Sequence, residues 1–265
     1  MPNNKFKVLV TRQDIPKEAI TRLQEECEVE IYPQSRPIPR DELLKRVKGK
    51  DGVYCLSDQI VDKEFLDAAG PSLKAGNTPG VVADSTAELA VSLMLATTRR
   101  FFDSHKQILN GGWANSDRSP LWNLGWGVSG STVGIFGLGN IGKEVIKKLQ
   151  GFNVKSFLYN SRTKKSKEEE LSAKFVSFDE LLRKSDFIII TCSFNADTKE
   201  IFNKDAFSRM KENAIVINVS RGALLPHIGT AELRTRRDMA VMSANNIIAA
   251  LKNEKMPTSL PKTFV

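Results

Sequence analysis

Arg221 and His227 are the two residues whose types and spacing first suggest chemistry. They stand six positions apart in INVSRGALLPHIGTAELRTRR, residues 217–237. An arginine can bind an anionic group through two parallel hydrogen bonds, and a histidine exchanges a proton near neutral pH. The chain contains only one other histidine, His105. Arg221 and His227 are therefore candidate catalytic residues, although a single histidine after a proline is more often structural.

A second candidate site lies in STVGIFGLGNIGKEVIKKL, residues 131–149, where an apolar run leads into an amphipathic segment. Gly137, Gly139 and Gly142 between them have the spacing of a dinucleotide-binding turn. In such a turn the first glycine allows a tight bend, the second lets a pyrophosphate approach the backbone, and the third lets helix and strand pack closely. The first helical amides, at Asn140, Ile141 and Gly142, would then hold the phosphates.

Two other interpretations of this glycine segment compete with that one. Residues 137–143 also fit the phosphate loop of nucleoside triphosphatases, but Glu144 stands where that loop needs a serine or threonine for magnesium. The glycines could also serve only a turn, and this structural alternative stays open.

The next apolar run, KSFLYNSRTKK, residues 155–165, bears on which dinucleotide is bound. An acidic residue at the end of this strand would bind the ribose hydroxyls of NAD. The sequence has Asn160 there, followed by Ser161, Arg162, Thr163 and Lys165. Cationic side chains can pair with a 2′-phosphate, which favours NADP(H), with NAD(H) as the alternative. These residues could also be no more than solvated turn residues.

Two further apolar runs end in polar residues: residues 185–195, with Cys192 and Ser193, and residues 214–222, with Val219 and Ser220. Ligands of parallel sheets bind outside the carboxyl ends of the strands, so these four residues are also predicted to contact the cofactor.

The elements that must position these residues alternate between apolar runs and amphipathic segments, which predicts a mostly parallel α/β sheet. We expect a Rossmann-type doubly wound sheet over residues 85–227. Residues 1–84 with 228–265 should form a smaller flavodoxin-like α/β substrate domain. A single long helix from Thr86 to Leu109, begun by a capping box of Ser85 and Glu88, is predicted to link the two domains.

Composition limits the class of protein. The chain has 265 residues, 41% of them hydrophobic, and a net charge of +8. The lysines and arginines are spread along the sequence instead of forming one stripe, which argues against nucleic acid as a partner. No apolar run is long enough for a bilayer, and no signal peptide is evident. Three scattered cysteines, Cys27, Cys55 and Cys192, indicate neither a disulfide framework nor a zinc site. We expect a cytoplasmic protein without a metal or a membrane partner.

Several motifs in the same order resemble the D-isomer-specific 2-hydroxyacid dehydrogenases. They are STVGIFGLGNIG, DFIIITCSFNADT, AIVINVSRG and PHIG. NTPGVVADSTAELAVSL, FLYNSR and ANNIIAAL make the sequence most similar to the branch that reduces glyoxylate and hydroxypyruvate. The resemblance implies NADPH-dependent reduction of small 2-oxo acids and a homodimer formed through the long helix and the loop around GGW and PLW.

The resemblance also implies roles for single residues. In the family an arginine holds the substrate carboxylate and keto oxygen. A histidine, its pKa raised by a glutamate, protonates the carbonyl while hydride arrives from the nicotinamide. Arg221, in SRG, matches that arginine, and His227, in PHIG, matches that histidine. By the same resemblance Gly229, the last residue of PHIG, is predicted to contact the cofactor.

The sequence departs from the family pattern in two places. SRGALL runs directly into PHIG, without the helix, the strands and the catalytic glutamate that family members carry between them. After SLK, residues 72–74, the strand and glycine-containing substrate loop are absent as well. The Rossmann-type sheet is therefore predicted to be shortened at one edge, with AIVINV as its last strand. The missing segments put catalytic competence in question. The alternative is a non-catalytic dinucleotide-binding protein or a truncated isoform acting through partners.

Overall fold

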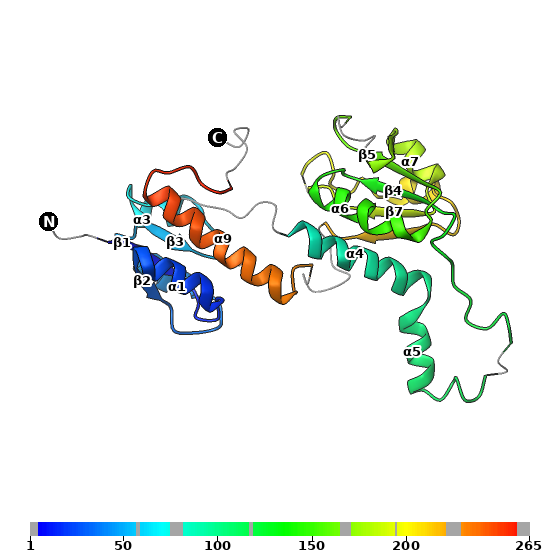
Figure 1. Cartoon of the computed structure of the whole chain (residues 1–265), viewed down its shortest axis with the longest axis horizontal. Coiled ribbons are helices and arrows are strands. Elements are labelled where there is room, and N and C mark those ends of the chain that lie inside the picture. The colour runs from blue at the N-terminus through cyan, green and yellow to red at the C-terminus, as the bar shows by residue number, and fades with distance from the viewer. Residues whose placement is uncertain are drawn as a thin grey trace. The chain divides into compact units, whose positions relative to one another are not determined.

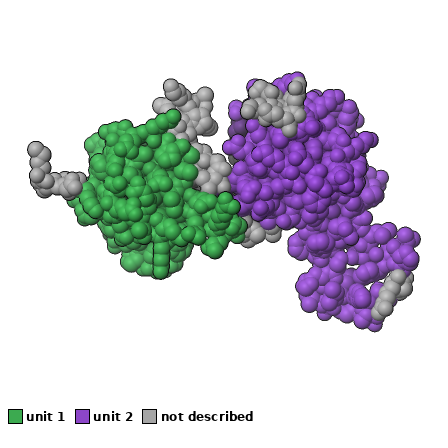
Figure 2. Space-filling model, in the orientation of Figure 1, with its two compact units in different colours: residues 1–81, 231–265 green, residues 82–230 purple. Residues whose placement is uncertain are grey.

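The computed structural model describes residues 5–56, 59–74, 82–116, 119–164, 171–193, 195–220 and 229–258 (Figure 1). The chain divides into two compact units (Figure 2). Unit 1 consists of Met1–Val81 and Ala231–Val265, and unit 2 of Val82–Thr230. The assignment of a substrate-binding role to the discontinuous unit, with domain bounds at residues 84 and 228, stays a prediction.

Unit 1 is a three-layer α/β unit around a parallel sheet in the order β2-β1-β3. Its strands are β1 (Phe6–Val10), β2 (Cys27–Ile31) and β3 (Gly52–Tyr54), and its helices are α1 (Lys17–Glu26), α2 (Arg40–Arg46), α3 (Lys63–Ala69) and α9 (Leu233–Leu251). Because side chains alternate along a strand, Val8 and Val10 of β1 pack with α1 and α9, whereas Leu9 packs with α2 and α3 on the other face.

Unit 2 contains a five-stranded parallel sheet in the order β6-β5-β4-β7-β8. The strands are β4 (Thr132–Phe136), β5 (Ser156–Asn160), β6 (Ala173–Phe175), β7 (Phe187–Ile190) and β8 (Ile215–Asn218). Its helical elements are α4 (Ala83–Thr98), α5 (Phe101–Leu109), α6 (Asn140–Leu149), the 3-10 turn η1 (Gln150–Phe152), α7 (Phe178–Lys184) and α8 (Lys204–Ser208).

Helices cover both faces of this second sheet. Val133 and Ile135 of β4 pack with α4 and α6 on one face, whereas Ile188 and Ile190 of β7 pack with α7 and α8 on the other. Because helices cover both faces, these strands have no polar side, which explains why they are near-continuous apolar runs in the sequence. The doubly wound α/β prediction is confirmed. In the part of the sheet that the structure describes, β8 is the edge strand on one side and β6 on the other.

The predicted single helix from Thr86 to Leu109 is wrong, because α4 ends at Thr98 and α5 begins at Phe101. Arg100 between them has a φ of 53°, which ends α-helical backbone. The carbonyl of Thr98 accepts a hydrogen bond from the Trp126 amide at 2.8 Å. The Thr98 hydroxyl donates to the Trp126 carbonyl at 2.9 Å. The chain that returns at Trp126 therefore caps α4 and separates it from α5.

The predicted capping box is also wrong. Helix α4 begins at Ala83, so Ser85 and Glu88 lie inside it. The Ser85 hydroxyl donates to the Val82 carbonyl instead of accepting from a helical amide.

Candidate functional site

The predicted cofactor residues gather at one edge of the unit 2 sheet. Because the strands are parallel, the carboxyl ends of β4, β5, β7 and β8 meet at this edge, where ligands of such sheets bind. The predicted residues at or just after these four ends are Gly137, Gly139, Asn140, Ile141, Gly142, Asn160, Ser161, Arg162, Thr163, Cys192, Ser193, Val219 and Ser220.

Gly137 makes the turn after β4 and requires a glycine for two reasons. Its φ is 103°, a conformation that other residues rarely adopt. A Cβ at this position would also lie 2.6 Å from the backbone of Cys192. The Gly137 amide donates to the Asn160 carbonyl at 2.8 Å, which ties the turn to the end of β5.

Gly142 and Gly139 differ in what surrounds them. A Cβ on Gly142 would lie 2.8 Å from the Ile135 side chain and 3.0 Å from the Gly137 carbonyl oxygen, so packing within the chain explains this glycine. A Cβ on Gly139 would meet nothing within 4 Å, and its φ of −92° suits any residue. Nothing in the described chain requires a glycine at 139, and the open space beside its Cα is available to a ligand.

Helix α6 starts beside this open space. Gly139 is its N-cap and provides no side-chain cap. The helical backbone hydrogen bonds of α6 begin with the Lys143 amide, which donates to the Gly139 carbonyl. Across the described residues, the amides of Asn140, Ile141 and Gly142 have no hydrogen-bond partner. Unpaired amides at a helix start attract anions, and the helix dipole adds to that attraction. The turn therefore fits the phosphates of a dinucleotide.

Thr191 belongs to this site although its sequence pattern did not single it out. Its hydroxyl donates to the Gly137 carbonyl at 2.7 Å, and its amide donates to the Phe136 carbonyl at 2.9 Å. The only signal in the sequence was a polar residue at the end of the apolar run FIII. A threonine there is ordinary for a strand, so nothing marked it as part of the turn.

The residues after β7 and β8 are linked to each other. The Ser220 hydroxyl donates to the Cys192 carbonyl, and the Val219 amide donates to the Ile190 carbonyl at 3.2 Å. Burial raises the pKa of the Cys192 thiol, opposed by a hydrogen bond with Ser220. A neutral thiol is a poor nucleophile, so Cys192 contributes to packing at the turn.

The end of β5 holds the residues predicted to select between the two dinucleotides. The Asn160 carboxamide donates to the Val176 carbonyl, just after β6, at 2.9 Å. The Ser161 hydroxyl donates to the Thr163 carbonyl at 2.8 Å, and Arg162 and Thr163 are exposed. Lys165 lies outside the described residues. The described part of this loop presents two exposed cationic residues, Arg162 and Lys164, and no carboxylate between positions 160 and 164.

The two catalytic candidates, Arg221 and His227, also lie outside the described residues. Gly229 is described and lies against α4, where its carbonyl accepts a hydrogen bond from the Thr86 hydroxyl at 3.4 Å. The structure thus unites the residues of the glycine turn with those after β5, β7 and β8, and it places Gly229 beside Thr86.

Neither a metal site nor a membrane-spanning helix occurs in the described part of the chain. No group of histidine, cysteine, aspartate or glutamate side chains in the described ranges could hold a metal ion. None of the helices in those ranges is long and apolar enough to cross a membrane.

Comparison with known proteins connects this geometry to a family. Residues 91–229 match the model of the D-isomer specific 2-hydroxyacid dehydrogenase, NAD binding domain. The glyoxylate reductase/hydroxypyruvate reductase of Homo sapiens is 38% identical, covering 98% of this chain and 99% of the relative. The glyoxylate reductase of Pyrococcus horikoshii is 33% identical, covering 98% and 97%. The alignment with the human protein runs over 327 positions, more than the 265 residues of this chain.

Solved structures agree in fold. A protein from Thermus thermophilus superimposes with a TM-score of 0.85 at 28% identity, covering 96% of this chain and 99% of the other. A glyoxylate reductase from Paecilomyes thermophila gives a TM-score of 0.84 at 23% identity, covering 99% and 100%. The sequence match over nearly the whole chain and the family model over residues 91–229 lead to the same conclusion: this chain belongs to the D-isomer specific 2-hydroxyacid dehydrogenase family.

Proposed function

We propose that this chain binds NADP(H) and reduces small 2-oxo acids, such as glyoxylate and hydroxypyruvate, to D-2-hydroxy acids. The names of its relatives support the substrate class, since proteins 38% and 33% identical over almost the whole chain are glyoxylate reductases. Family membership supports a nicotinamide dinucleotide as the hydride donor.

The observation that carries the binding part of the proposal is the space beside Gly139. Neither backbone conformation nor packing in the described residues requires a glycine there. A pyrophosphate lying against the α6 amides does require it, because a Cβ at this position would occupy the approach to the backbone.

The loop after β5 supports NADP(H) over NAD(H). Asn160 occupies the position where NAD-binding sheets place a carboxylate for the ribose hydroxyls. A carboxylate would repel a 2′-phosphate, whereas the exposed Arg162 can pair with it. Lys165, which follows Lys164 in the sequence, is also proposed to pair with the 2′-phosphate.

The proposed catalytic residues are Arg221 and His227. Reduction of a 2-oxo acid adds a hydride to the carbonyl carbon and a proton to the carbonyl oxygen. The bound dinucleotide supplies the hydride. Arg221 is proposed to hold the substrate carboxylate through paired hydrogen bonds. His227 is proposed to supply the proton, for which an imidazole near neutral pH is suited.

Gly139→Ala tests the binding site with little risk to the fold. We expect wild type to bind NADPH by calorimetry and to oxidise it when hydroxypyruvate is added. Gly139→Ala should keep the wild-type melting temperature and lose at least about tenfold in NADPH affinity. Gly151→Ala is the matched control, because a Cβ there also meets nothing within 4 Å but lies in η1, away from the turn. Equal NADPH binding by both variants would contradict the proposed site.

A second candidate function is dinucleotide binding without turnover. It is favoured because SRGALL runs directly into PHIG, with no glutamate between the two motifs. The relatives align over more positions than this chain has residues. If the glutamate that supports the histidine is absent, His227 loses both orientation and the stabilisation of its protonated form. Saturable NADPH binding without NADPH oxidation would select this second function over the first.

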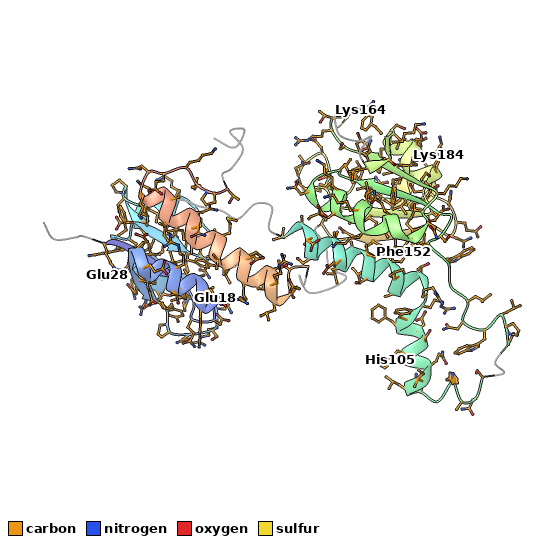
Figure 3. All side chains as sticks on the ribbon, viewed as in Figure 1. Glu18, Glu28, His105, Phe152, Lys164 and Lys184 are labelled. Carbon is orange, nitrogen blue, oxygen red and sulfur yellow. The ribbon has the colours of Figure 1, made fainter. Side chains whose placement is uncertain are left out.

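We also propose that the chain forms a homodimer through α5 and the residues that follow it. No residue of α5 is buried, and its side chains, with His105 among them, stand clear of the sheet of its unit (Figure 3). Exposed apolar residues of this segment include Phe102, Ile108, Leu109, Leu121, Leu124 and Trp126. Large apolar side chains left exposed in this number are typical of an interaction site, and an identical segment of a second copy would cover them.

A further inference from the structure

The backbone of Gly137 is held from both neighbouring strands, through the two peptide groups that flank its Cα. On the β5 side its amide donates to the Asn160 carbonyl at 2.8 Å. On the β7 side its carbonyl accepts from the Thr191 hydroxyl at 2.7 Å. The first bond joins two backbone groups and forms with any residue at 160. The second depends on a hydroxyl side chain at position 191.

The Thr191 bond determines which way the Gly137 carbonyl points. The same oxygen accepts from the Gly139 amide at 2.8 Å and lies 3.0 Å from the place of a Cβ on Gly142. The carbonyl therefore points inward, between β7 and the first turn of α6. If the Gly137–Leu138 peptide group rotated by half a turn, the Gly137 carbonyl oxygen would face the space beside Gly139 and would repel an anion there. The unpaired amides of Asn140 to Gly142 would also lose the support of the Gly139 bond.

Thr191 is suited to hold this orientation. Its backbone continues the pairing of β7 with β4 through the amide bond to Phe136. Two heavy atoms on its Cβ restrict the side-chain torsion, so the hydroxyl is presented to Gly137 with little loss of rotamer freedom. The side chain is half-buried, where a hydroxyl competes less with water for the carbonyl.

We propose that Thr191 is a positioning residue for the dinucleotide turn. Its hydroxyl holds the Gly137 carbonyl inward, and the α6 amides thereby stay available to the phosphates. The inference rests on the proposed dinucleotide binding, because Thr191 acts on the cofactor only through Gly137.

Three variants test this role. Thr191→Val keeps the shape and removes the hydroxyl, whereas Thr191→Ser keeps the hydroxyl. Thr132→Val is the matched control, because the Thr132 hydroxyl pairs with the Ser156 hydroxyl at 3.1 Å at the opposite end of β4. Binding of NADPH and of NADH is measured by calorimetry, and the melting temperature is measured in parallel.

We expect Thr191→Val to weaken NADPH binding by about tenfold, the scale of one lost hydrogen bond near a charged ligand. Thr191→Ser should stay within about twofold of wild type, and Thr132→Val should leave affinity unchanged. Unchanged affinity in Thr191→Val would overturn the inference, even if its melting temperature fell. Equal weakening in Thr191→Ser would overturn it too, because the hydroxyl would then not be the cause.

Hydrogen exchange separates this inference from the proposed function. If wild type binds neither dinucleotide, the proposed function fails, but exchange of the amides at 137–143 can still be compared without ligand. Faster exchange there in Thr191→Val, and not in Thr191→Ser or Thr132→Val, supports the positioning role. Identical exchange in all four proteins would overturn that role.

Discussion

The Ser185 hydroxyl lies against the backbone of Gly134 and has no hydrogen-bond partner among the described residues. Ser185 is fully buried at the end of α7, and a methyl group on Gly134 would overlap its hydroxyl and press on Leu181. The glycine in the middle of β4 therefore lets α7 approach the sheet closely. This close approach leaves a buried hydroxyl without a partner.

Replacing Ser185 with alanine should stabilise the protein. A buried, unpaired hydroxyl costs about 1–3 kcal/mol, so we expect Ser185→Ala to raise the free energy of unfolding by about 1 kcal/mol in urea denaturation. Ser177→Ala is the control, because the Ser177 hydroxyl accepts from the Glu180 amide at 3.1 Å as the N-cap of the same helix. That variant should lose about 1 kcal/mol. A destabilised Ser185→Ala protein would show that the hydroxyl is paired in solution.

Asn160→Asp, the simplest change toward an NAD-type site, should destabilise the turn. The Asn160 carboxamide donates to the Val176 carbonyl, and a carboxylate would bring a negative oxygen to that acceptor. We expect a loss of about 1–2 kcal/mol in the free energy of unfolding. The affinity of the Asn160→Asp variant for NADH should also stay below the affinity of wild type for NADPH.

Asn203→Asp is the control for that substitution. The Asn203 oxygen accepts from the Ala206 amide at the start of α8, so a carboxylate keeps the bond and suits the helix dipole. Its stability should match or exceed that of wild type. An Asn160→Asp protein as stable as Asn203→Asp would mean that the Val176 bond contributes nothing.

Stability of unit 1 should depend on acid pH through Glu30. A hydrogen bond from Lys50 at 2.6 Å lowers the Glu30 pKa below its ordinary value. Partial burial opposes this effect, and a second hydrogen bond, from Arg46 at 2.8 Å, adds to it. A lowered folded pKa stabilises the fold above the unfolded pKa of about 4.3. That contribution is lost as pH falls through the folded pKa. Because the side chain is 35% exposed, solvent screening limits it to about 1 kcal/mol or less.

The measurement is the difference in unfolding free energy between wild type and Glu30→Gln from pH 7 to pH 3. The difference should be present at pH 7 and shrink below about pH 4. Glu28→Gln, at an exposed position on the same strand (Figure 3), is the control. If the difference in unfolding free energy between wild type and Glu30→Gln stayed constant down to pH 3, the charge of Glu30 would not be what stabilises the fold.

Ile108→Glu should convert the proposed dimer to a monomer. The Ile108 side chain is 62% exposed on α5, and a charge buried in a dimer interface without a partner is costly. Ile60→Glu is the control, since Ile60 is 70% exposed in unit 1. Analytical ultracentrifugation should give a dimer for wild type and Ile60→Glu and a monomer for Ile108→Glu. A monomeric wild type would refute the homodimer.

How much the sequence predicts depends on how far apart the interacting residues lie. The glycine turn was predicted because Gly137, Gly139 and Gly142 act within six positions and their context is local. The break after α4 was missed because Trp126 produces it from 28 residues away. Thr191 was missed for the same reason, since its partner Gly137 lies 54 positions earlier.

Asn160 illustrates a different limit. The pattern places it at the end of a strand, as the structure does, and predicts that it binds the cofactor. The structure shows its amide bonded to Val176, sixteen positions later, which no periodicity reveals. A cofactor contact by Asn160 stays a prediction. A side chain with both a donor and an acceptor can do more than one thing at the same position.

Helix α9 imposes an order on folding during synthesis. Its Ala244, Ile247 and Leu251 fill one side of the core that begins with β1, and the Ile247 side chain packs directly against Gly52 of β3. On the ribosome, all of residues 82–230 emerge before α9 does. Unit 2 is continuous in sequence and can fold as soon as it emerges. The strands of unit 1 are made first, yet the face that α1 and α9 share is completed last, when the helix encoded after unit 2 packs against it.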